Sequence, residues 1–173
     1  MNVSVSAGSY PNVSTDLHHT APTQQFLLFG QEESLFAVEL ITVREVLCLN
    51  DQSISPIPNA LPFVLGLTNL RGEILAVGDF GRLIGAEPVD TQHSHSRILV
   101  IEAPEPQDVS LRVMRMGLAV SRVQGVLSLN TEEIVSAVEV SEELAPLLKG
   151  LYDSEGRLVM ILDVEAIAQS ERW

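Results

Sequence analysis

The sequence predicts a mainly β protein built from two similar small β units that share one hydrophobic core. Three observations lead to this prediction. Short apolar runs rich in Val, Ile, Leu and Phe alternate with turn residues along most of the chain, which is typical of strands in a β-sandwich or barrel. One segment of the chain recurs later without gaps. The chain is also 46% hydrophobic, which is enough to bury a core.

The chain begins with a polar segment. Residues 1–23 are rich in Ser, Thr, Asn, Pro and His and have no sustained apolar periodicity. A segment of this composition buries too little apolar surface to offset the entropy lost on ordering. We therefore expect a flexible tail over residues 1–23, followed by a single domain over residues 24–173.

From Gln25 onward, the apolar runs have the length and composition of strands. Each run is rich in β-branched, aliphatic or aromatic residues and ends at turn residues. In one run, Met114 and Met116 share the face that we expect to pack in the core, and Arg115 lies on the other face. Cys48 ends another run, where we expect it to act as a small buried hydrophobic residue. Strands are predicted within residues 26–29, 35–40, 43–49, 65–70, 74–77, 98–101, 114–120, 123–129 and 158–162.

Helical signals are few and brief. Thr131 and Ser141 are each followed by two glutamates, a pattern that indicates single helical turns with an N-terminal cap. Asp163 precedes the sequence VEAIA, which predicts a C-terminal helix over about residues 163–170.

The internal repeat is the most informative feature of the chain. Residues 62–84 align without gaps onto residues 146–168, and two shorter blocks (26–29 with 98–101, and 43–47 with 123–127) recur in the same order. Each unit is too small to fold stably by itself, so we expect the two units to share a core. We place the first unit at about residues 35–90 and the second at about residues 96–162.

Residues common to both copies are expected to be needed for folding. Gly72 and Gly156 each lie between two strand-like runs, where a hairpin turn requires positive φ. Asp79 and Asp163 each follow a strand and open a helix-like stretch. Their symmetric placement favours helix capping over a catalytic carboxylate pair.

Residues that differ between the copies are freer to be functional. The first hairpin tip reads Asn69-Leu70-Arg71-Gly72, and the second reads Asp-Ser-Glu-Gly with Glu155 at the position of Arg71. The fold itself therefore does not demand an arginine at this tip.

Charge and composition exclude several classes of function. The net charge of −13 repels phosphate backbones and anionic lipids, so a nucleic acid is not expected as a partner. No apolar run approaches the ~18 residues needed to cross a bilayer. A single cysteine cannot form a disulfide within the chain, which suits a reducing cytosol.

No catalytic, metal or cofactor site is expected. The histidines, at positions 18, 19, 93 and 95, lack cysteine or carboxylate companions at zinc-site spacing. The sequence also contains no phosphate-binding loop, no dinucleotide-binding fingerprint and no nucleophile elbow. These observations favour an interaction protein over an enzyme.

Three stretches carry a family resemblance. The most specific is residues 62–72, PFVLGLTNLRG, and it is supported by VREV at 43–46 and VQGVLSL at 123–129. On these residues the chain resembles the CheW-like coupling proteins of bacterial chemotaxis, from about Gln25 to Ser170.

This resemblance implies a fold and a function. The fold would be two five-stranded SH3-like barrels joined by a hydrophobic seam, with short helices that include a C-terminal one. The protein would be a non-enzymatic, cytoplasmic adaptor in a chemotaxis, phototaxis or twitching pathway, located at receptor arrays on the inner membrane. Its partners would be the regulatory domain of a CheA-type histidine kinase, which has the same fold, and the helical tips of chemoreceptors.

The resemblance also implies six partner-binding residues. Val43 would line a receptor groove, with Glu45 and Arg71 as its polar neighbours. An arginine suits this role because its planar fork can hold a carboxylate while its flat face covers apolar surface. The loop that presents Arg71 would be shaped by Asn69, Leu70 and Gly72.

Two alternatives remain. The chain could be a free-standing copy of the kinase regulatory domain that binds the same partners, or a small-ligand-binding β-barrel.

The chain departs from the family pattern in three places. The N-terminal tail is long, and residues 78–81, GDFG, are rich in glycine. The stretch 103–111, APEPQDVSL, is expected to lengthen a turn in the second unit.

Overall fold

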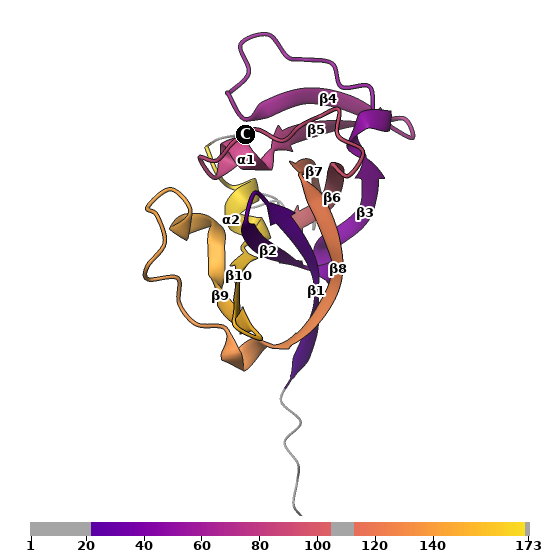
Figure 1. Cartoon of the computed structure of the whole chain (residues 1–173). Coiled ribbons are helices and arrows are strands. Elements are labelled where there is room, and N and C mark those ends of the chain that lie inside the picture. Colours follow the sequence, from indigo (N-terminus) through magenta and orange to yellow (C-terminus); the bar gives the residue numbers. More distant parts are fainter. Residues whose placement is uncertain (1–21, 105–112, 172–173) are drawn as a thin grey trace, which may run out of the picture.

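The computed structural model describes residues 22–104 and 113–171, and these form two five-stranded β-sheets (Figure 1). The first sheet has the spatial order β8 (Arg122–Asn130), β1 (Thr23–Gln31), β2 (Ser34–Glu39), β10 (Arg157–Leu162) and β9 (Leu148–Ser154). The second sheet has the order β3 (Val43–Cys48), β6 (Arg97–Pro104), β7 (Val113–Val120), β5 (Glu73–Asp79) and β4 (Val64–Leu70).

Helices in the described residues are short. The two α-helices are α1 (Phe80–Leu83) and α2 (Val164–Ala168), and the 3-10 turns are η1 (Leu40–Thr42), η2 (Leu49–Asp51), η3 (Thr131–Glu133) and η4 (Ala145–Leu147). None of the helices described is long and apolar enough to cross a membrane. The predicted mainly β fold and the predicted C-terminal helix are both confirmed.

Every predicted strand corresponds to an observed strand, although Leu40 and Leu49 at the ends of two predicted runs belong to η1 and η2, and β9 was indicated only by the repeat. In β7, Met116 is buried, Met114 is partly buried against the core, and Arg115 is exposed, as the alternation predicts. Two local predictions need correction. Cys48 is only half-buried, and the cap of η3 is Asn130 rather than Thr131, because the Asn130 side chain accepts the backbone N–H of Glu132.

The repeated segments form equivalent units in different sheets. The order β4, β5, α1 in the second sheet matches β9, β10, α2 in the first. Both hairpin turns place two consecutive residues at positive φ: Arg71 (51°) and Gly72 (88°), and Glu155 (54°) and Gly156 (84°). Two positive φ angles give the turn type that suits the twist of a β-hairpin.

Side chains stabilise these turns and helix starts in the same way in both copies. The backbone N–H of Gly72 donates to Oδ1 of Asn69 at 2.8 Å, and in the second copy the N–H of Gly156 donates to Asp153 at 2.7 Å. Helix capping by the repeated aspartates is also confirmed, because Asp79 caps α1 and Asp163 caps α2.

Strands of the two copies are exchanged between the sheets. The early strands β1 and β2 lie beside the late strands β8 and β10, as the indigo, orange and yellow ribbons in Figure 1 show. The second sheet likewise combines β3, β4 and β5 with β6 and β7. The predicted unit bounds of 35–90 and 96–162 therefore differ from the observed sheets, since neither sheet is a continuous stretch of chain.

A shared core explains this exchange. The largest buried cluster takes side chains from both sheets and both helices. At its centre, the ring of Phe80 lies 5.1 Å from that of Phe29 and 4.8 Å from that of Phe36, both edge-on. Small units cannot bury both faces of their own strands, and the exchange joins them through one apolar seam.

Two predictions fall outside the described residues. Residues 1–21 of the expected tail are not described, whereas Thr23 belongs to β1 and pairs with Asn130 of β8. Most of the expected lengthened turn, residues 105–112, is likewise not described.

Candidate functional site

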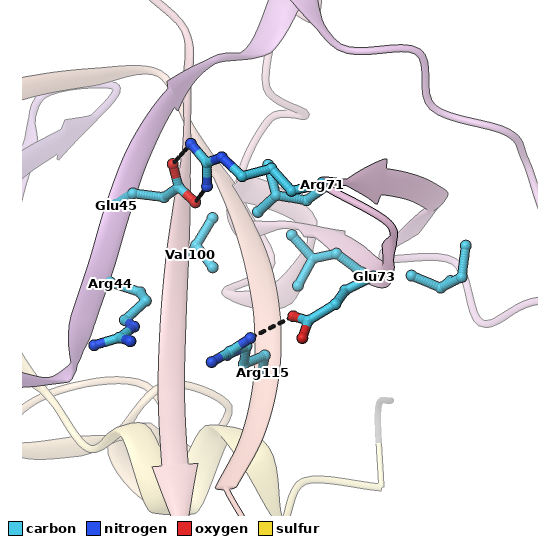
Figure 2. Close-up of a pocket in the computed structure, with 9 residues that line it drawn as sticks. Arg44, Glu45, Arg71, Glu73, Val100 and Arg115 are labelled. Atoms are coloured by element: carbon cyan, nitrogen blue, oxygen red, sulfur yellow. Dashed lines mark hydrogen bonds and ion pairs between the residues drawn. The ribbon is translucent and has the colours of Figure 1, made fainter.

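An open pocket of about 280 Å³ lies on the face of the second sheet that points away from the largest core cluster (Figure 2). The buried side chains of Leu75 and Val100 form its base, and Ile74, 68% exposed, stands at its side. Charged side chains surround this apolar base. They come from three strands and one hairpin tip: Arg44 and Glu45 from β3, Arg71 from the β4–β5 turn, Glu73 from β5 and Arg115 from β7.

Arg71 and Glu45 form a two-pronged ion pair at one end of the pocket. The guanidinium nitrogens Nη1 and Nη2 of Arg71 donate to Oε1 and Oε2 of Glu45 at 2.6 and 2.9 Å. This hydrogen bonding holds the pKa of Glu45 below its usual value and raises that of Arg71. The Arg71 side chain is nevertheless 73% exposed. The turn and the ion pair therefore hold an exposed guanidinium in one fixed position.

A second charge network lies at the other end of the pocket. Nε of Arg115 donates to Oε1 of Glu102 at 2.7 Å, and Nη1 of Arg115 is paired with Glu73. Nε of Arg44 lies 3.3 Å from the same oxygen of Glu102. As Figure 2 shows, Val100 lies between the Arg71–Glu45 pair and the Arg115–Glu73 pair.

The structure brings three of the six predicted site residues to this pocket: Glu45, Leu70 and Arg71. Asn69 and Gly72 are at the tip, where they form the turn. Val43 is elsewhere and packs, partly buried, against the central core. The pairing of β3 with β6 shifts register between Val43 and Glu45, so their spacing of two residues does not place them in the same environment.

Sequence reasoning missed Arg44, Glu73 and Arg115 as members of this site. Arg115 was placed correctly on the outer face of its strand, but no local pattern shows that β7 lies beside β5. A comparison of the two copies could have indicated Glu73, because the second copy has Arg157 at that position.

The pocket is suited to binding rather than catalysis. It combines an exposed apolar surface with ion pairs and fixed arginines, which are features of protein interaction sites. In residues 22–104 and 113–171, no group of three His, Cys, Asp or Glu side chains is placed to hold a metal ion.

Comparison with known proteins identifies the family. The family model described as CheW-like domain matches residues 25–172. The chain belongs to the CheW-like domain family. The resemblance carried by residues 43–46, 62–72 and 123–129 is thereby confirmed.

Named relatives match this CheW-like chain over most of their length. It is 31% identical over 145 residues to the chemotaxis protein CheW of Thermotoga maritima, covering 84% of this chain and 87% of the relative. Identity to the chemotaxis protein CheW of Rhizobium meliloti is 25% over 155 residues, covering 89% and 93%.

A solved structure supports the fold. The scaffolding protein TtCheW from Thermoanaerobacter tengcongensis superimposes with a TM-score of 0.73 at 23% identity, covering 90% of this chain and 94% of that protein. The prediction of two SH3-like barrels joined by a hydrophobic seam is confirmed at the level of the fold.

Proposed function

We propose that this chain is an adaptor that couples chemoreceptor-type sensors to a CheA-type histidine kinase in a motility pathway, and that it acts in the cytoplasm at receptor arrays. The similarity to chemotaxis proteins named CheW, over 87% and 93% of their lengths, supports an adaptor over a free-standing module like the kinase regulatory domain. The alternative of a small-ligand barrel has less support, because the apolar side chain Ile74 and the guanidinium of Arg71 at this pocket are both largely exposed rather than enclosed.

The observation that carries the proposal is the asymmetry of the two hairpin tips. Both tips have the same backbone geometry and an exposed apolar side chain after the turn, Ile74 or Leu158, but only the first carries an arginine at the turn position itself. A recognition site needs a side chain that is exposed and held in a fixed position. Arg71 meets this need, and the fold itself does not require an arginine there.

Arg71 can bind a partner without leaving Glu45. A guanidinium has five N–H donors, and the pair with Glu45 uses one from each of two nitrogens. The remaining donors and the flat face are free to contact a partner carboxylate and an apolar side chain. In this proposal Glu45, Leu70 and Arg71 contact the partner, Asn69 and Gly72 hold the turn, and Val43, which packs against the central core, supports the start of β3.

The test is the variant Arg71→Glu with Glu155→Arg as its matched control. Both variants should fold, because the equivalent turn position accepts glutamate at φ 54° in one copy and arginine at φ 51° in the other. Charge reversal at the first tip should weaken binding by at least about 30-fold, since it removes an attraction and adds a repulsion. The control should bind like the wild type.

Calorimetric titration against the purified cognate kinase regulatory domain and receptor tip measures both affinities, and circular dichroism checks folding. If folded Arg71→Glu binds both partners as tightly as the wild type, the partner surface lies elsewhere on the protein.

A further inference from the structure

The second sheet can be compared with the first, position by position, through strand pairing. In the second sheet Val77 of β5 pairs with Gly117 of β7, and in the first sheet the equivalent Ile161 pairs with Ala37. Gly117 therefore corresponds to Ala37, and two residues earlier Arg115 corresponds to Leu35. In the next strand pair, Glu102 lies opposite Arg115 and Gly30 lies opposite Leu35, so Glu102 corresponds to Gly30.

Positions at the base of the pocket keep their apolar character in both copies, whereas the charged positions around it do not. The apolar base of the pocket is apolar in both copies: Val100 corresponds to Leu28, Leu75 to Val159 and Ile74 to Leu158. Every charged position around the pocket changes instead. Arg44, Glu45, Arg71, Glu73, Glu102 and Arg115 correspond, in this order, to Gln124, Gly125, Glu155, Arg157, Gly30 and Leu35.

The charge of the pocket also differs from that of the rest of the chain. The protein carries a net charge of −13, whereas the charges at this pocket balance: Arg44, Arg71 and Arg115 lie beside Glu45, Glu73 and the neighbouring Glu102. The side chains of Arg44 and Arg115 are 63% and 41% exposed. An acidic partner segment, repelled by most of the acidic surface, therefore meets less repulsion here and finds exposed guanidinium groups with which it can pair.

Arg115 is able to exchange partners. Its contact with Glu73 is an exposed ion pair, and such pairs add little stability. A carboxylate on an incoming protein can replace Glu73 at small cost, while Glu102 keeps the guanidinium in position at 2.7 Å.

We propose that Arg115 is a second specificity-determining residue of the docking site and that the site takes a protein segment with an apolar side chain flanked by carboxylates. The apolar side chain lies on Ile74, Leu75 and Val100, one carboxylate meets Arg71, and the other meets Arg115. Glu102 is the positioning residue for Arg115. This inference rests on the proposed adaptor function, and it adds the chemistry of the partner surface.

The test uses three variants and the purified cognate kinase regulatory domain and receptor tip as probes. Arg115→Leu removes the cation and introduces the residue that the first sheet holds at the equivalent strand position, and circular dichroism checks its folding. It should weaken binding to at least one probe about tenfold and reduce the dependence of affinity on salt. Arg157→Leu makes the same change in net charge at the other hairpin and should stay within about twofold of the wild type.

A third variant separates recognition from a merely structural role. Glu73→Gln removes the carboxylate that competes for Arg115, so it should tighten binding, whereas the loss of a purely structural ion pair would not.

The inference is overturned if Arg115→Leu matches Arg157→Leu in affinity and salt dependence for both probes. If Arg71→Glu still weakens binding in that case, the adaptor site stands and only the role of Arg115 is wrong. If neither arginine matters, the docking site itself is wrong.

Discussion

Asp79 provides the sharpest test of what stabilises the fold, because Asp163, the equivalent residue of the second copy, serves as its control. The Asp79 side chain is 1% exposed and accepts the backbone N–H of Arg82 at 3.1 Å and that of Val89, which is shared between Oδ1 at 3.2 Å and Oδ2 at 3.1 Å. It therefore caps α1 and also ties the segment after α1 to the second sheet. Asp163 caps α2 through the N–H of Ala166 at 3.0 Å and is half-buried.

The expected costs of removing these carboxylates differ. Asp163→Ala loses a helix cap, which typically costs about 1 kcal/mol. Asp79→Ala loses a cap as well and leaves the buried N–H of Val89 without its partner, which adds about 1–3 kcal/mol. Burial raises the pKa of Asp79, so relief of that desolvation offsets part of the loss. We expect Asp79→Ala to lower the free energy of unfolding by about 2–3 kcal/mol, roughly 1–2 kcal/mol more than Asp163→Ala.

Urea unfolding at pH 7, followed by circular dichroism, measures both differences at once. Asp79→Asn, which keeps one acceptor oxygen, should fall between the wild type and the alanine variant. Equal losses for Asp79→Ala and Asp163→Ala would show that the contact with Val89 contributes nothing, and the reasoning would fail.

Two further predictions concern the shared core and the ion pair. Fragments 22–84 and 96–171 should each lack a cooperative unfolding transition, because each sheet needs strands from both fragments. Mixing the two fragments should restore a single transition in circular dichroism. A fragment that folds by itself would contradict the exchanged core. The ion pair with Arg71 lowers the pKa of folded Glu45, so its contribution is present above the unfolded value of about 4.3 and is lost as pH falls through the folded pKa. The stability difference between wild type and Glu45→Gln, measured by urea unfolding, should therefore shrink from pH 7 to about pH 3, and a constant difference would rule this out.

The sequence by itself determined the local structure. Apolar runs located the strands, because a strand that packs on a core must carry β-branched and aliphatic residues. The repeat supplied β9, the equivalence of the two hairpins, and the roles of Gly72 and Asp79, since turns and caps are set by residues a few positions apart. It also indicated Arg71, because the other copy folds with glutamate at the same place.

Only the tertiary structure decided which strands pair and which charges meet. Strand periodicity states which face a residue occupies but not which strand lies beside it, so the exchange of β1 and β2 between the copies left no local signal. The same limit applies to the docking site. Arg71 meets Glu45 and Arg115 meets Glu73 across separate strands, and a register shift in β3 turns Val43 away from Glu45. These partners are fixed by non-local pairing and by a core that neither copy can form alone.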